Sequence, residues 1–132
     1  VRVEALRSTD AGVAYLVTAD GKTIYHAGDL HWWHWEGEPK ADNGTMAANF
    51  KAFTEPLRGR RIDLAMVPLD GRLKEAEDWG LCCLLDLAEL RTVIPMHQWE
   101  DYSPTERFLQ KHPEQAGRIL PVTQEPQSWE IP

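Results

Sequence analysis

Two residues that could bind a metal ion each follow an apolar strand pattern. Asp29 comes after the run that ends in Gly28, and His97 comes directly after the run from Val93 to Met96. Carboxylate oxygen and imidazole nitrogen are both common ligands of zinc. The chain has no His-x-His or His-x-x-x-His pair that could supply further imidazoles. The pattern therefore predicts half of a metal site, formed by Asp29 and His97.

The segment after Asp29 is rich in aromatic side chains and has neither helical nor strand periodicity. His31, Trp32 and His34 lie in this segment, directly downstream of the candidate ligand. A loop in this position should overhang the site, and exposed tryptophans need cover, so we interpret it as a substrate-lining lid or a partner contact. The alternative is a loop that folds back onto the protein's own core.

Asp70 and Arg72 follow another buried strand pattern, which ends at Pro68. Ligands of α/β folds bind at the carboxyl ends of the strands, so these two residues are candidates for substrate contacts or for positioning a ligand. An ordinary Asp-Gly turn is the alternative for Asp70. His26 is interpreted as a core or groove histidine, and His112, at a predicted helix end, receives no function.

Alternating apolar patterns and turn signals predict the elements that must position these residues. Asp20-Gly21 predicts a hairpin turn, and Ser103-Pro104 together with Glu106 predicts a capped helix start. Strands are expected at 1–7, 13–18, 22–27, 62–67, 92–96 and 119–122, with a further one around Trp129; helices are expected from Thr45 to Gly59, from Glu75 to Leu90 and from Ser103 to His112. Helices alternate with strands over most of the chain, which indicates an α/β fold in a single domain, residues 1–132.

Composition limits the partners. The net charge of −7 argues against nucleic acid and anionic membrane, because both require a cationic surface. No apolar run is long enough for a membrane span. The adjacent Cys82 and Cys83 would point about 100° apart on a helix, so a disulfide between them is not expected. We interpret them as reduced core residues of a cytoplasmic protein, with no redox or metal-binding role. The chain opens inside a strand pattern, which is typical of a fragment or a processed product.

The segment Gly21 to Asp29 resembles the metallo-β-lactamase fold hydrolases, in particular the branch of ascorbate-6-phosphate lactonase-like proteins. In that family one strand ends in Gly-Asp and a later strand ends in a histidine, which Ile94-Pro95-Met96-His97 matches. The segments Ser8 to Val13 and Val67 to Asp70 also fit loops of that branch. The resemblance spans the whole chain but only the C-terminal half of the family's fold, and the family's His-x-His-x-Asp-His motif is absent.

The resemblance implies half of an αββα sandwich, in which a mixed sheet carries helices on one face only. It implies a divalent metal, zinc first with manganese or iron as alternatives, bound by Asp29 and His97, and Asp29 as the catalytic carboxylate of a small-molecule hydrolase. It also implies a partner for the bare sheet face, either a homodimer or a complex with an N-terminal half. Whether the chain is an enzyme alone stays open, and a non-catalytic scaffold or interaction domain is the alternative.

Overall fold

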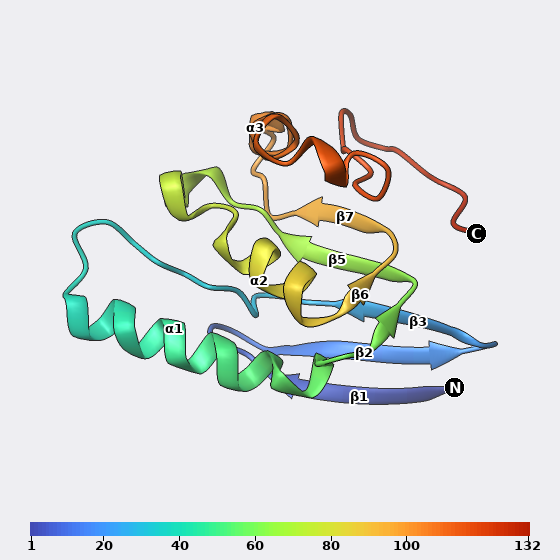
Figure 1. Ribbon diagram of the computed structural model, residues 1–132, viewed down its shortest axis with the longest axis horizontal. Coiled ribbons are helices and arrows are strands. Elements are labelled where there is room, and N and C mark those ends of the chain that lie inside the picture. Colours follow the sequence, from blue (N-terminus) through green and yellow to red (C-terminus); the bar gives the residue numbers. More distant parts are fainter.

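The computed structural model describes residues 1–132 and centres on a five-stranded sheet (Figure 1). The strands, in the order in which they lie in the sheet, are β1 (Arg2–Arg7), β2 (Val13–Ala19), β3 (Lys22–His26), β5 (Leu64–Pro68) and β7 (Val93–Met96). The first three pair antiparallel, whereas β3, β5 and β7 are parallel. A parallel pair, β4 (Arg61–Ile62) and β6 (Glu89–Leu90), lies apart. The mixed α/β class predicted from the sequence is confirmed.

The hairpin between β2 and β3 turns at Asp20 and Gly21, as predicted. Both residues have positive φ, 51° and 75°. A two-residue turn that needs positive φ at both positions matches the right-handed twist of the flanking strands, and Asp-Gly is a favoured sequence for it. The turn fixes the register in which Tyr15 faces His26 and Leu16 faces Tyr25.

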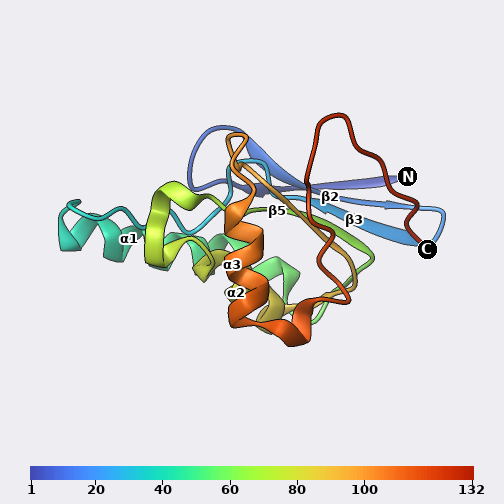
Figure 2. The ribbon, with the colours of Figure 1, turned by 90° about the horizontal axis from the view of Figure 1, so that it is seen from above.

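The helices lie on one side of the sheet (Figure 2). They are α1 (Lys40–Thr54), α2 (Trp79–Leu87) and α3 (Ser103–Lys111), with short 3-10 turns η1 (Glu55–Leu57), η2 (Gly71–Ala76) and η3 (Pro113–Gln115). The strand residues that face them are buried: Leu6, Ala14, Leu16, Tyr25, Ala65, Val67 and Val93. None of the helices combines the length and the apolar character that crossing a lipid bilayer requires.

The opposite sheet face has no helix on it. Alternate residues of each strand point to opposite faces, so the neighbours of the buried strand residues make up this second face. Val3, Val13 and Tyr15 on it are exposed, with 57%, 39% and 46% of their surface in contact with solvent. Met66, Ile94 and Met96 are half-buried. We call this surface the open face.

Helix α1 begins five residues before the predicted Thr45 cap, at Lys40. Pro39 precedes the helix with φ −54°, and the Asn43 side chain accepts from the amide of Trp35 and donates to its carbonyl. The contact between Asn43 and Trp35 thus stabilises the first turn of α1, and a rule based on capping residues alone does not predict it.

Two further elements differ from the sequence-based expectation. The strand predicted over residues 62–67 is divided at Asp63, whose carboxylate accepts from the Thr23 amide and whose own amide donates to the Thr23 carbonyl. The helix predicted from Glu75 to Leu90 is shorter, because η2 precedes it and its last residues form β6, which pairs with β4.

The C-terminal third also departs from prediction in detail. The predicted capping box is wrong, because the Asp101 carboxylate, rather than the Glu106 side chain, accepts from the Ser103 amide at the start of α3. The predicted strand at 119–122 is reduced to a single parallel bridge between Ile119 and Val93, and no strand forms around Trp129.

We expect Tyr25→Phe to stabilise the protein. The Tyr25 ring is fully buried and its hydroxyl has no hydrogen-bond partner. Removing an unsatisfied buried hydroxyl should increase the free energy of unfolding by roughly 1–2 kcal/mol, the desolvation cost of such a group. Urea denaturation measures this, with Tyr15→Phe on the exposed face as the matched control that should change little. A loss of stability in Tyr25→Phe would contradict the assignment.

Candidate functional site

The three parallel strands bring their carboxyl ends to the same edge of the sheet. Asp29 follows β3, Asp70 follows β5, and His97 follows β7. Because parallel neighbours end side by side, the residues after them converge although they are far apart in the sequence. The residues that the sequence identified one by one are thus parts of a single group, which we call the strand-end site.

The imidazole of His97 lies between two carboxylates. Its Nε2 is 3.3 Å from Asp29 Oδ1, and its Nδ1 is 2.9 Å from Asp70 Oδ2. The Asp29 side chain is 34% exposed and that of His97 22%, so solvent reaches this part of the site. One ring nitrogen therefore faces a buried carboxylate, and the other faces a carboxylate that solvent can reach.

Asp70 is the buried anchor of the site. Its side chain is 1% exposed and pairs with the Arg72 guanidinium through contacts of 2.7–3.2 Å. The Trp99 indole also donates to it, at 3.3 Å. Burial alone would raise the pKa of Asp70, but the hydrogen bonds from Arg72 and His97 outweigh it and lower the pKa below its usual value. Asp70 is therefore ionised at neutral pH and accepts a proton-bearing Nδ1 of His97.

Unusual backbone conformations surround the site. His97, Trp99 and Glu100 have φ values of 66°, 54° and 63°, a region that residues other than glycine rarely adopt. Such conformations persist where the surroundings enforce them, and they gather at functional sites. Gly28 also has positive φ, and a Cβ there would lie 2.9 Å from the Val13 carbonyl oxygen. Only glycine allows the chain to leave β3 so close to β2 and present Asp29.

His31 lies behind the strand-end site instead of lining it. The residue is fully buried, and neither ring nitrogen has a hydrogen-bond partner. Burial lowers the pKa of His31 to about 3, although the charge of Asp70 raises it and that of His97 lowers it further. A Cβ on Gly80 of α2 would lie 2.6 Å from its Nδ1, so the helix packs directly on the ring. For His31, the structure therefore matches the alternative stated above, in which the aromatic loop folds back onto the protein's own core.

The other aromatic loop residues connect the site to the helices. Trp33 is buried, with its ring 5.0 Å from that of His97, and its indole donates to the Asp29 carbonyl. Trp32 and His34 are half-buried and pack on Trp79 of α2, at ring distances of 5.4 Å and 4.7 Å. Their predicted contact with a substrate stays a prediction. Trp33, which was not among the residues that the sequence singled out, is the member of this loop whose ring contacts His97.

Arg72 is the solvent-exposed partner in the ion pair with Asp70. Its guanidinium lies over the rings of Trp35, at 5.4 Å, and Trp99, at 4.9 Å. The side chain is half exposed, so its outer edge can meet a ligand from solvent. The substrate role predicted for Arg72 stays a prediction, and so does that of Asp70, whose buried carboxylate contacts Arg72, His97 and Trp99.

A cavity of about 340 Å³ opens beside His97 on the open face of the sheet. His97, Glu100 and His26 are among the residues that line it. The remaining wall is mostly apolar and comprises Met66, Ile94, Pro95, Met96, Gln98, Trp99, Tyr102, Val122 and Glu125. An apolar cavity with a few convergent polar groups is typical of small-molecule sites.

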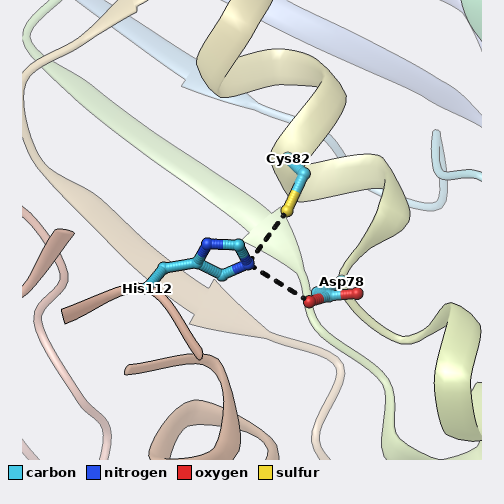
Figure 3. Close-up of side chains that lie close together, drawn as sticks. All are labelled: Asp78, Cys82 and His112. Atoms are coloured by element: carbon cyan, nitrogen blue, oxygen red, sulfur yellow. Dashed lines mark hydrogen bonds and ion pairs between the residues drawn. The ribbon is translucent and has the colours of Figure 1, made fainter. Parts of the chain in front are cut away.

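A second group of possible metal ligands lies between α2 and α3 (Figure 3). His112 Nε2 is 3.7 Å from Cys82 Sγ and 3.6 Å from Asp78 Oδ2, and the three ligand atoms all lie within 4.8 Å of one another. This group could hold a metal ion. The sequence-based interpretation gave Cys82 no metal-binding role and His112 no function, whereas the structure brings both beside Asp78. The four-residue spacing of Asp78 and Cys82 would place them on one helix face, but nothing local indicates that His112 joins them.

Comparison with protein-family models, with curated proteins and with solved structures found no match to this chain.

We expect the stability of the metal-free protein to fall as the pH falls below about 6.5. The unfolded His31 takes up a proton near that pH, whereas the folded one stays neutral down to about 3. The unfolded state then binds more protons, and the His31 contribution should approach 1.4 kcal/mol per pH unit, about the value for one proton.

Urea denaturation between pH 7 and pH 5, in the presence of a chelator, measures this slope. His31→Leu should flatten the slope, whereas His34→Leu in the same loop should not. Equal slopes for the wild type and His31→Leu would contradict the neutral, buried state of His31.

Proposed function

We propose that the chain is a metal-dependent hydrolase module of the metallo-β-lactamase fold, with Asp29 and His97 as metal ligands. The supporting observation is the distance of 3.3 Å between Asp29 Oδ1 and His97 Nε2. Two ligands about 2.1 Å from a tetrahedral zinc ion are roughly 3.4 Å apart. A charge-assisted hydrogen bond would be shorter, about 2.7–2.9 Å. The spacing therefore suits two atoms that share a cation.

Asp70 supports this assignment by fixing the orientation of His97. Metal-binding histidines usually donate their other ring N–H to a carboxylate, carbonyl or water, which sets the tautomer and the ring plane. Asp70 Oδ2 accepts from Nδ1 at 2.9 Å, so the Nε2 lone pair is directed toward Asp29. In this proposal Asp70 is a positioning residue, and Arg72 keeps it ionised.

The residues present fit a divalent ion only as part of a larger ligand set. One carboxylate and one imidazole are two protein ligands, whereas catalytic zinc typically has three and a water. Zinc fits this ligand pair best, and manganese and iron are the alternatives. The remaining ligands would come from a segment that covers the open face, because the cavity beside His97 opens there.

When bound, such a cation lowers the pKa of water and polarises a scissile carbonyl or phosphoryl group. The chain's own residues would do the rest. The exposed carboxylate of Asp29 can orient a water molecule and accept a proton from it. Arg72 can neutralise the charge of an anionic substrate. The apolar wall of the cavity would hold the body of a small molecule.

We expect zinc binding at the strand-end site to be weak in this chain alone and to depend on both ligands. Titration calorimetry and NMR of the imidazole nitrogens measure it, in a Cys82→Ser background so that the group between α2 and α3 does not contribute. Asp29→Ala and His97→Ala should abolish the binding, and Asp70→Asn should weaken it about 10–100-fold, the usual effect of losing such a partner.

His26→Ala is the matched control, because His26 lines the same cavity but forms no hydrogen bond or ion pair with Asp29 or His97. It should leave zinc binding unchanged. Zinc affinity that survives both Asp29→Ala and His97→Ala would show that the proposed ligands are wrong.

A second candidate, a non-catalytic scaffold or interaction domain, is favoured by the open face. The same face supports the proposed partner, because an apolar sheet surface of this kind is usually covered. Val3, Val13 and Tyr15 lie on the two strands farthest from the cavity, so a second β-layer packed there would extend the covered area across the sheet. We propose that a second copy of the chain, or a separate N-terminal half, supplies that layer.

We expect the isolated chain to form a dimer whose fraction rises with concentration. Size-exclusion chromatography with light scattering measures the mass. Tyr15→Glu places a charge on the open face and should shift the equilibrium to monomer, whereas Gln110→Glu adds the same charge on the exposed side of α3 and should not. A stable monomer at high concentration would exclude the homodimer and leave the separate N-terminal half as the partner to test.

A further inference from the structure

The site between α2 and α3 combines three chemically different ligand types in one place. Asp78 stands at the start of α2, Cys82 is one turn later on the same helix, and His112 ends α3 (Figure 3). The Cys82 amide also donates a backbone hydrogen bond to the Asp78 carbonyl, at 2.9 Å. Two ligands therefore share a rigid helical turn, and the third comes from an element 30 residues away.

The two distances that His112 makes with the other ligand atoms fit a tetrahedral ion. With zinc–sulfur and zinc–nitrogen lengths of about 2.3 and 2.05 Å, the sulfur and nitrogen atoms of a tetrahedral site are roughly 3.6 Å apart. Cys82 Sγ and His112 Nε2 are 3.7 Å apart. The corresponding oxygen–nitrogen separation is about 3.4 Å, and Asp78 Oδ2 lies 3.6 Å from the same nitrogen.

The surroundings provide the orientation that a metal-binding histidine needs. The Nδ1 of His112, the nitrogen away from the cluster, lies 3.5 Å from Glu114 Oε1. A carboxylate on that side favours the tautomer that leaves Nε2 free to bind a cation. Asp78 is 9% exposed and His112 34%, so the group is partly sheltered and still open to solvent. A cavity of about 170 Å³, also lined by Asp86, adjoins it.

We propose that Asp78, Cys82 and His112 form a binding site for a zinc-class divalent ion that ties the start of α2 to the end of α3. This site is separate from the strand-end site and does not depend on the proposed hydrolase function. A thiolate, an imidazole and a carboxylate together favour borderline ions such as zinc over magnesium or calcium, which prefer oxygen ligands alone. A water would fill the fourth position.

The Lys111 ammonium and the protonated Cys82 thiol both disfavour binding of the ion. The Lys111 ammonium lies 3.7 Å from Asp78 Oδ2 and must swing into solvent when the cation enters. Its side chain is half exposed, so the movement is open to it. Burial, with Asp78 and Asp86, raises the pKa of Cys82 to about 11. The thiol is therefore protonated without a cation, and coordination releases one proton to solvent.

Cobalt(II) is the probe, because it takes the place of zinc and a thiolate ligand gives it a charge-transfer absorption in the near ultraviolet. The purified chain should develop this band as cobalt is added, and excess zinc should abolish it. Cys82→Ser should remove the band, and His112→Gln should raise the dissociation constant at least about tenfold. A chain that shows no such band at excess cobalt would overturn the proposal.

Cys83→Ser is the matched control, because Cys83 is the neighbouring thiol, is half-buried like Cys82 and takes no part in the cluster. It should keep the band, and so should the double variant Asp29→Ala with His97→Ala, which removes the strand-end ligands. Loss of the band in Cys83→Ser, with retention in Cys82→Ser, would refute the assignment. Loss in the double variant would mean that the cobalt is not bound between α2 and α3.

Zinc should also raise the melting temperature of the wild type, by about 5 °C at saturating concentration, since only the folded state assembles the three ligands. Cys82→Ser should lose most of this rise, because only the weak strand-end site remains, while keeping the metal-free melting temperature within a few degrees. An equal rise in the wild type and in Cys82→Ser would contradict a site that contains the thiolate.

Discussion

The buried carboxylate of Asp70 is the contact on which the strand-end site depends. It lies at 1% exposure and is held by Arg72, His97 and Trp99 at once. Such a group is tolerated in a protein interior only when charged or polar partners satisfy it. The same contacts hold His97 and Trp99 in left-handed backbone conformations that would otherwise relax. Removing the carboxylate would therefore release the loop as well as the imidazole.

The asymmetry of the sheet follows from the order of its connections. Parallel pairing of β3, β5 and β7 requires crossovers, and the helices in these crossovers pack on the same face (Figure 2). That face holds the core of 19 buried residues. The other face keeps exposed apolar side chains on β1 and β2. The cavity beside His97, whose wall includes Val122 and Glu125 of the C-terminal segment, opens onto the same face. The proposed site and the proposed partner surface are thus parts of one region.

The sequence predicted the features that local patterns determine. Asp20-Gly21 indicated the hairpin, and apolar runs ending in Asp29 and His97 indicated strands whose ends would meet. The burial of His31 was not predictable, because a loop without periodicity does not show which ring turns inward. The start of α1 depends on the contact between Asn43 and Trp35, and the pairing of β4 with β6 joins residues far apart in the chain. Cys82 and His112 meet for the same nonlocal reason.

The close packing of α2 against the aromatic loop joins two regions that the sequence separates. Gly80 lies so near the His31 ring that even a methyl group would have to displace it. Asp78 and Cys82 stand two residues to either side on the same short segment. The first turn of α2 therefore contacts the His31 ring through Gly80 and also carries the Cys82 thiol. A shift of this turn would therefore move the surroundings of both the His31 ring and the Cys82 thiol.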